Sequence, residues 1–244
     1  MTTDAHGRTH RLELDDQTLR DWDATVLASD ADHGIVLDSS AFYPGGGGQP
    51  PDHGVLLWGG VQTRIVDVRK ADDLWLVPNE NDPLPVVGTA VRGAIEDERR
   101  TNLMRTHSGL HLLSGVVFRD FGALVTGGNM EPGQARMDFN LPEVPPDFKA
   151  TVEAACNVEI DADRAIAVSV LPRSEAFAIP DIIRTATNLV PAEVEMVRIV
   201  DINGLDVQAD GGTHVASTRQ IGRIEVVKVE NKGKGFRRVR MRLA

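Results

Sequence analysis

Two histidines one helical turn apart are the first residues in this sequence whose spacing suggests chemistry. They are His107 and His111, within the stretch Arg105-Thr-His-Ser-Gly-Leu-His-Leu-Leu-Ser-Gly115. Residues four apart share a helix face, so both imidazoles can point at one ion or one substrate. The spacing alone leaves a second interpretation open, in which both rings are partly buried in an amphipathic helix. Ser108 stands where a zinc peptidase with the pattern H-E-x-x-H has its general base, so the sequence argues against such a peptidase.

A second cluster lies about a hundred residues further along the chain. Asp210 and His214 are also four apart, separated by Gly211-Gly212-Thr213. The glycines can bend the backbone so that both side chains converge. Together, His107, His111, Asp210 and His214 can give one zinc ion tetrahedral or near-tetrahedral coordination, with water in any open position. A structural role stays open for each residue of the second cluster, with Asp210 as a helix cap and His214 as a hydrogen-bonded core residue.

The charge balance restricts how the protein can meet nucleic acid. The chain of 244 residues has 26 basic and 36 acidic residues, a net charge of -10. This balance argues against binding over the whole surface, so any such contact must be a local patch. The best patch runs from Lys228 to Arg242, where seven cations accompany only Glu230 as an acid. Clustered cations suit phosphate contact, and a solvated hairpin that protects a sheet edge is the alternative.

A single cysteine, Cys156, excludes an internal disulfide and a Cys-rich zinc finger. It fits a reducing compartment, and we expect it to be a small buried apolar side chain. The sequence has no run of 18 apolar residues, and its first residues lack the pattern of a secretion signal. We therefore expect a soluble, cytoplasmic protein without membrane contact.

The elements that position these residues fall into two predicted domains, 1–94 and 95–244. The first shows short apolar runs separated by turn residues, which predicts a small antiparallel β domain such as a barrel. Within it, Gly45–Gly48 permit positive φ and close approach of the backbone to a partner, with a flexible hairpin loop as the alternative. The expected strands are 24–28, 34–37, 55–58, 61–68, 74–77 and 89–93.

The charged segment Glu96–Arg100 predicts the start of a helix that extends to about Arg119. His107 and His111 then lie in its middle, which pre-organises a site. Helices and mostly antiparallel strands make the second domain α+β. We expect a turn region at 127–133, strands at 135–139, 165–171 and 194–202, a helix at 147–160, short irregular pieces at 174–178 and 181–186, and a hairpin formed by 221–230 and 236–243.

Five motifs in a fixed order make the sequence recognisable. They are Leu37–Gly54, Arg105–Leu113, Arg136–Phe139, Gln208–Val215 and Glu230–Arg238. With them, nearly the whole chain resembles the AlaX family, free-standing relatives of the editing domain of alanyl-tRNA synthetase, in its medium-length form. The resemblance implies a translation-protein-like β-barrel followed by an α+β editing domain with an antiparallel sheet and long helices. It also implies a zinc-dependent deacylase for translation fidelity, which hydrolyses mischarged tRNA for alanine in trans, chiefly the seryl and sometimes the glycyl ester.

The resemblance extends the candidate site beyond the four ligands. Thr106 and Thr213 flank the ligands and are candidates for a catalytic contribution, although each can bond to the local backbone. The Gly-rich loop, Gly45, Gly46, Gly47, Gly48 and Gln49, is a candidate for substrate discrimination. Lys232, Lys234, Arg237 and Arg238 are candidates for contact with the acceptor end of the tRNA.

One position departs from the family pattern. Asp210 stands where the family has a zinc-binding cysteine. A carboxylate is an acceptable zinc ligand, but its harder oxygen should change metal affinity and preference. Alternatives are a three-histidine site in which Asp210 is unligated or acts as a general base, a metal-dependent hydrolase of another aminoacyl ester, and a non-catalytic tRNA-binding protein.

Overall fold

The structure, a computed structural model, describes residues 9–188 and 190–244. The chain divides into two compact units. The first extends to Thr101, and the second takes in Gly47–Gln49 and Asn102–Ala244. The division falls within helix α2, Asp97–Phe121. The predicted boundary near residue 94 remains a proposal about independently folding domains.

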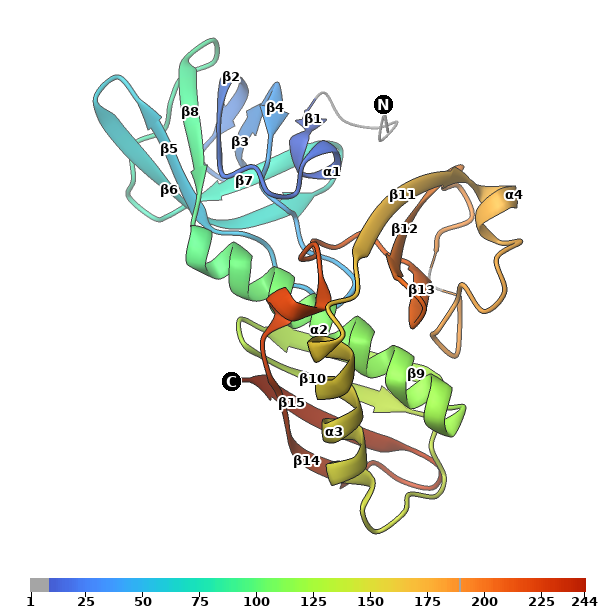
Figure 1. Cartoon of the computed structure of the whole chain (residues 1–244). Helices are drawn as coiled ribbons and strands as arrows, with labels where there is room; N and C mark the ends of the chain where they lie inside the picture. Colours follow the sequence, from blue (N-terminus) through green and yellow to red (C-terminus); the bar gives the residue numbers. More distant parts are fainter. Residues whose placement is uncertain (1–8, 189) are drawn as a thin grey trace. The chain divides into compact units, whose positions relative to one another are not determined.

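The first unit contains a closed antiparallel barrel with the strand order β2-β3-β7-β6-β5-β8 (Figure 1). Side chains alternate across its strands: Trp22, Ala24 and Val26 of β2 point inward, and they pack with Leu56 and Leu76 in the barrel core. This alternation is the two-residue period of a strand with one buried face. The barrel predicted from the short apolar runs is confirmed. The strands are β2 (Asp21–Asp30), β3 (Gly34–Leu37), β5 (Gly54–Trp58), β6 (Val61–Lys70), β7 (Leu74–Pro78) and β8 (Ala90–Ile95), with β1 (His10–Arg11), α1 (Leu12–Asp15) and β4 (Ser39–Ser40) beside them.

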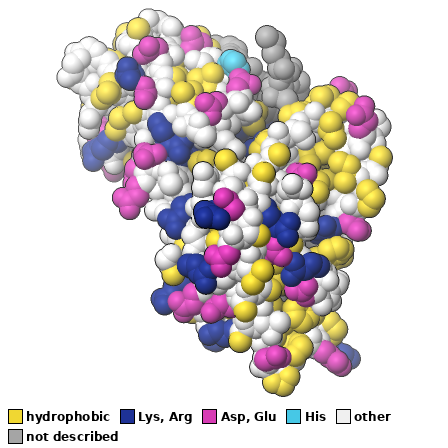
Figure 2. Space-filling model, in the orientation of Figure 1, with side chains coloured by type: hydrophobic (Ala, Val, Ile, Leu, Met, Phe, Trp, Pro, Cys, Tyr) yellow, Lys and Arg dark blue, Asp and Glu magenta, His cyan; other side chains and the backbone are white. Residues whose placement is uncertain are grey.

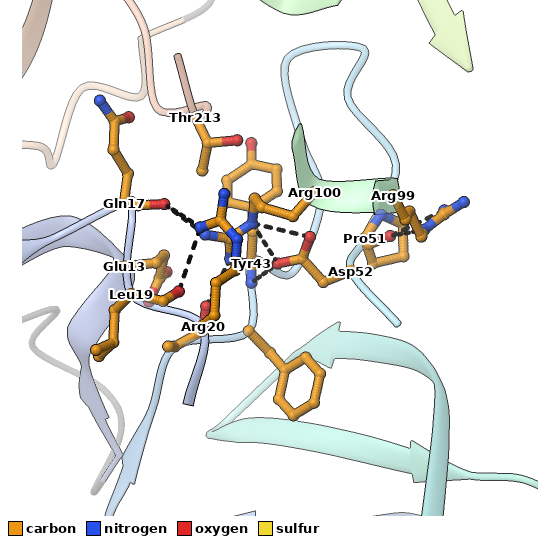
Figure 3. Close-up of polar contacts among 12 residues, drawn as sticks. Glu13, Gln17, Leu19, Arg20, Tyr43, Pro51, Asp52, Arg99, Arg100 and Thr213 are labelled. Atoms are coloured by element: carbon orange, nitrogen blue, oxygen red, sulfur yellow. Dashed lines mark hydrogen bonds and ion pairs between the residues drawn. The ribbon is translucent and has the colours of Figure 1, made fainter. Parts of the chain in front are cut away.

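A buried ion pair closes the base of the Gly-rich loop (Figure 3). Arg100 and Asp52 are both fully buried, and Arg100 Nε donates to both carboxylate oxygens of Asp52 at 3.0 Å. The same carboxylate accepts from the N–H of Tyr43 at 2.7 Å, and the N–H of Asp52 donates back to the carbonyl of Tyr43 at 3.0 Å. The pair therefore fixes both ends of the segment that carries the glycines. A buried charge needs such a partner, because alone it would face a large desolvation cost.

The second unit places α2 and α3 (Phe148–Asp161) with a four-stranded antiparallel sheet of order β14-β15-β10-β9 (Figure 1). Leu112 and Val116 of α2 share its core with Val152 and Cys156 of α3, which confirms Cys156 as a buried apolar side chain. The strands are β9 (Val125–Glu131), β10 (Gln134–Phe139), β14 (Ile224–Asn231) and β15 (Arg237–Leu243).

The expected turn region at 127–133 was wrong. Most of it is strand β9, whose residues pair with β10, and the turn shrinks to Pro132-Gly133. Backbone pairing with β10 outweighs the low strand propensity of Gly127 and Gly128, because propensity for strands depends strongly on context.

A separate three-stranded sheet of the second unit has the order β11-β12-β13. One of its faces packs against a small cluster that includes Ala176 and Ile182, and its other face contributes Ile166, Val200 and Ile202 to the main core. Its elements are β11 (Ile166–Pro172), β12 (Met196–Ile202) and β13 (Asp206–Ala209), with α4 (Arg173–Ala176) and a 3-10 turn, η1 (Thr218–Ile221), nearby in sequence. The predicted α+β class is confirmed. None of the described helices is both long and apolar enough to cross a membrane.

Candidate metal centre

The four predicted ligands converge in the second unit. His107 and His111 come from α2, and Asp210 and His214 follow β13. Each offers one ligand atom, and these atoms all lie within 4.8 Å of one another. The three histidines are buried and Asp210 is nearly so. This cluster can hold a metal ion.

The distances fit a four-coordinate ion. The Nε2 atoms of His107 and His111 lie 3.6 and 3.9 Å from Asp210 Oδ1, and His214 Nε2 lies 3.1 Å from Asp210 Oδ2. Ligand atoms around tetrahedral zinc are about 3.4 Å apart, since each is about 2.1 Å from the ion. Three imidazole nitrogens and one carboxylate oxygen also form a donor set that zinc accepts.

All three rings turn Nε2 toward the centre, and the Nδ1 atoms of two of them are held by hydrogen bonds from behind. His107 Nδ1 lies 2.9 Å from Gln49 Oε1, and His214 Nδ1 lies 3.1 Å from Ser108 Oγ. His111 Nδ1 faces Asp206 Oδ2 at 3.8 Å and makes no hydrogen bond to the described residues. Metal-binding histidines typically use one nitrogen for the ion and orient the ring through the other.

Gln49 fixes the tautomer of His107. The backbone N–H of Thr213 donates to Gln49 Oε1 at 3.1 Å, so the amide must present its oxygen on this side. His107 Nδ1 therefore carries the proton that it shares with this oxygen, and Nε2 keeps its lone pair for an ion. The Gln49 amide nitrogen donates to Thr213 Oγ1 at 2.9 Å. The structure thus places a residue of the Gly-rich loop directly behind a candidate ligand.

Glycines leave the room that the cluster needs. A Cβ on Gly212 would lie 2.2 Å from Cε1 of His107, and a Cβ on Gly47 would lie 3.2 Å from Asp210 Oδ1. Gly45 to Gly48 all have positive φ, between 58° and 129°, which side chains disfavour. The sequence predicted glycines for a bend in the backbone, whereas Gly212 is required by the space that the His107 ring occupies.

The two flanking threonines differ in their contacts. Thr106 is buried, and its hydroxyl donates to the carbonyl of Asn102 at 2.6 Å and accepts from the N–H of Gly133 at 2.9 Å. The first is the local backbone bond that the sequence left open as an alternative, and the second joins α2 to the turn after β9. Thr213 Oγ1 instead lies beside Gln49.

Sequence reasoning missed two residues behind the ligands, Ser108 and Asp206. Asp206 is buried; its Oδ1 accepts from Arg184 Nε at 3.0 Å and its Oδ2 from Gln208 Nε2 at 2.6 Å. A signal for it existed, since residues 206, 208 and 210 alternate as one face of a strand would. Ser108 had no such signal beyond its place between the two histidines.

The electrostatics leave the donor set ready for a cation. Burial holds the pKa of His107 well below its ordinary value and lowers that of His214 to about 4. Burial alone would raise the pKa of Asp210, but the histidines around it hold that pKa well below the usual range. Burial opposes protonation of His111 as well, yet Asp210 outweighs burial and raises its pKa. The carboxylate of Asp210 thus favours positive charge at the centre of the cluster, and a metal ion would supply such a charge.

The basic segment from Lys228 to Arg242 is more extensively paired with carboxylates than its sequence suggested. Arg238 donates to Asp138 at 2.7 and 2.8 Å, Arg242 to Glu225 at 2.7 Å and Arg240 to Glu230 at 3.0 Å. The expectation that only Glu230 faces these cations was wrong, because the strand register brings in carboxylates from β10 and β14. On the face shown in Figure 2, basic and acidic side chains are intermixed around α3 and β14.

The tip of the same hairpin keeps exposed cations. Lys232 and Lys234 are exposed. Arg237 donates to the carbonyl of Pro142 at 2.8 Å, and with Lys234 it lines a surface pocket between the hairpin tip and Pro142-Glu143. Lys232 and Lys234 are therefore the better placed of the four predicted tRNA contacts.

The fold and the site together define a two-unit α+β protein with a buried centre that can hold a metal ion. Residues 197–240 match the family described as the threonyl and alanyl tRNA synthetase second additional domain, and residues 17–99 match class II (A) tRNA synthetases. The chain is 38% identical to the alanyl-tRNA editing protein AlaX-M of Saccharolobus solfataricus over 234 residues, which cover 95% of this chain and 97% of that protein. It therefore belongs to the AlaX-M family of alanyl-tRNA editing proteins.

Two further relatives show the same relationship. An AlaX-M protein of Methanosarcina barkeri is 33% identical over 236 residues, 95% of this chain and 97% of that protein. An alanine–tRNA ligase of Pyrobaculum neutrophilum is 35% identical over 233 residues, which make up 93% of this chain but 26% of the ligase. The chain thus spans about a quarter of the ligase and nearly the whole of the editing proteins.

Proposed function

We propose that this protein is a trans-editing hydrolase that deacylates mischarged tRNA for alanine, with the seryl ester as its main substrate and the glycyl ester as a second. One observation carries the proposal: four donor atoms converge in a buried centre within 4.8 Å of one another, in a chain whose relatives are named alanyl-tRNA editing proteins. We propose that the centre holds one zinc ion.

The residues of the chain would hold the ion and keep its ligands in place. His107, His111 and His214 supply nitrogens, and Gln49 and Ser108 orient two of the rings from behind. The N–H of Gly212 donates to Asp210 Oδ2 at 2.6 Å, which fixes the carboxylate and directs Oδ1 toward His107 and His111. A bound zinc ion supplies a Lewis acid for an ester carbonyl and lowers the pKa of water to about 7.

Selection of serine over alanine requires a polar partner for the added hydroxyl. A site that hydrogen-bonds a hydroxyl disfavours a substrate that leaves that partner unpaired. Thr213 is suited to this role, since it is buried at the cluster and its oxygen accepts from Gln49, which leaves its own proton to donate. The contacts of Thr106 suit a supporting role in the backbone around the ligands.

The tRNA would meet the hairpin tip through its phosphates. Lys232 and Lys234 supply exposed positive charge on a net acidic protein, and charges of this kind give affinity without reading sequence. Arg237 and Arg238 flank the tip and also make contacts within the fold. Recognition of the tRNA for alanine itself is proposed from the family.

The test compares deacylation of seryl-, glycyl- and alanyl-tRNA for alanine by the wild-type protein and by His107→Ala, with metal content measured on the same samples. We expect the wild type to spare alanyl-tRNA and His107→Ala to lose both the metal and the activity. His33→Ala, an exposed histidine of the first unit, is the control and should keep both.

Three outcomes would contradict parts of the proposal. Full activity and metal in His107→Ala would show that the cluster is not the site. Equal turnover of free seryl esters and seryl-tRNA would indicate a general ester hydrolase. Binding of tRNA without metal or deacylation would indicate a non-catalytic tRNA-binding protein.

A further inference from the structure

The three-stranded sheet of the second unit exposes an apolar strip beside the metal centre. Three side chains form it: Val168 and Val170 of β11, each 37% exposed, and Met196 of β12, 48% exposed. We call Val168, Val170 and Met196 the β11 strip. β11 is an edge strand of this sheet. Figure 2 shows hydrophobic side chains at the surface around β11 and α4.

The β11 strip lies on the same face of the sheet as the metal cluster. In the antiparallel register Val170 faces Arg198, and the N–H of Asp210 donates to the carbonyl of Arg198 at 3.1 Å. Residues opposite one another on paired strands point to the same side, so Val170, Arg198 and Asp210 form one row across the sheet. In the next row Val168 faces Val200, which faces Gln208.

The other face of the sheet is already covered. Leu171, Val197 and Ile199 pack there in a cluster with Ala176 and Ile182. The strip face continues into the main core through Ile166, Val200 and Ile202 and is exposed only at its outer end. Val168 and Val170 are thus the exposed part of a sheet face, and the opposite end of the same face carries the candidate ligand Asp210.

The row of Val170, Arg198 and Asp210 has a defined length, and its three positions differ in chemical character. Neighbouring strands are about 4.8 Å apart, so Val170 lies roughly 10 Å from Asp210 across the sheet. Between them, Arg198 donates through Nη1 to the carbonyl of Asp210 at 3.1 Å. From one end to the other, the row therefore presents the metal cluster, a cation and an apolar surface.

We propose that the β11 strip receives the terminal adenine base of an aminoacyl-tRNA while the ester lies at the metal cluster. This inference rests on the proposed function. The amino acid of a charged tRNA is esterified to the ribose of its 3′-terminal adenosine, so a ribose separates ester from base, as Arg198 separates Asp210 from Val170. A flat base can pack its face on apolar side chains, and the charge of Arg198 suits the adjoining phosphate.

The probe is a non-hydrolysable analogue, adenosine carrying serine in an amide bond at its 3′ position, with serinamide as the ligand without a base. We would measure binding of both to the metal-loaded full chain by calorimetry. Val170→Asp places a charge where the base would pack, and we expect about tenfold weaker binding of the analogue. The affinity for serinamide should stay unchanged. Val170→Thr keeps the shape of valine and should give a smaller loss.

A matched variant controls for surface charge. Val227→Asp changes a valine of β14 that is 44% exposed and lies outside the strip, and it should leave the affinity for the analogue unchanged. Melting temperatures of all variants, and Val168→Asp as an independent change in the same strip, distinguish lost binding from lost folding.

Several results would overturn the inference. One is equal affinity of wild type and both strip variants for the analogue, and another is an equal loss in Val227→Asp. A change in oligomeric state by light scattering in the strip variants, without a change in analogue affinity, would assign the strip to a second copy of the chain. If seryl-tRNA is not hydrolysed but analogue binding still depends on Val170, the proposed function fails and the adenine site stands.

Discussion

The two halves of the candidate metal centre are built in different ways. His107 and His111 stand on one face of α2, a helix of 25 residues, so the spacing of a regular element sets their separation. Asp210 and His214 lie in an irregular segment, where Gly212 makes room for the ring of His107 and Gln49 binds both Thr213 and His107. The helix sets the spacing of the helical half, whereas the irregular half depends on contacts from several segments of the chain.

Beyond the ligands themselves, the comparison places the positions that are most sensitive to small changes in packing outside the helix. The first three predictions test whether the irregular half is as dependent on close packing as its contacts suggest.

The largest effect is expected from Gly212→Ala. A Cβ there would lie 2.2 and 2.3 Å from two atoms of the His107 ring, so the ligand must move. We expect a loss of deacylation of about 100-fold or more, as misplacement by about 1 Å can cause. Overpacking should also lower the free energy of unfolding by about 1–3 kcal/mol. Kinetics, metal analysis and chemical denaturation measure these effects.

Gly211→Ala is the control for this change. A Cβ on Gly211 meets nothing within 4 Å, and this residue does not have positive φ. It should keep metal and activity. If Gly211→Ala and Gly212→Ala lose activity to the same extent, the site does not depend on the space that Gly212 leaves for the His107 ring.

A smaller effect is expected from Gln49→Leu. This change removes the oxygen that accepts from His107 Nδ1 and from the N–H of Thr213. Loss of such an orienting partner should weaken metal binding by roughly 10- to 100-fold. Gln49→Glu keeps an acceptor oxygen and should retain more of the affinity. Competition with a chelator measures both, and equal affinities in the two variants would contradict a role for the acceptor.

Asp210→Cys tests whether the carboxylate of the irregular half is a ligand of the metal. A thiolate is softer than a carboxylate, so zinc should bind several-fold more tightly and the preference for zinc over harder divalent ions should rise. Metal competition with purified apoprotein measures the change. Unaltered preference would place Asp210 outside the coordination shell, in a site held by the three histidines.

The same contrast explains what the sequence could predict. Both clusters and most strands follow from short-range spacing, and the long helix follows from its acidic start at Asp97 and Glu98. Gln49 lies 58 residues from His107 in sequence, so no local pattern links them. The partner of Arg238 is likewise 100 residues away in β10 and is set by strand register. Contacts of this range depend on tertiary packing.

The basic hairpin gives a weaker effect. Lys232→Ala with Lys234→Ala should weaken tRNA binding and flatten its salt dependence, by ~0.9 in slope for each duplex phosphate that the variant no longer neutralises. Arg240→Ala is the control. Arg240 is paired with Glu230, so its charge is already partly neutralised within the fold, and we expect its loss to change the salt dependence less. Binding of uncharged tRNA at several salt concentrations measures both. Equal slopes in wild type and the double variant would exclude the tip from tRNA contact.

The smallest effect is expected on stability, from the ion pair between Arg238 and Asp138, in which Arg238 has a structural role. Hydrogen bonds from Arg238 are the main cause that holds the pKa of Asp138 below its usual value. A carboxyl whose pKa is lowered by folding stabilises the fold above its unfolded pKa, about 3.9, and loses that contribution as the pH falls through the folded value. Asp138→Asn should therefore lower the free energy of unfolding at pH 7 by at most about 1 kcal/mol, since the pair is partly exposed. The difference from wild type should vanish in acid, below the lowered pKa. Denaturation curves at pH 7 and in acid measure this, and a difference that persists unchanged in acid would show that Asp138 does not act through its charge.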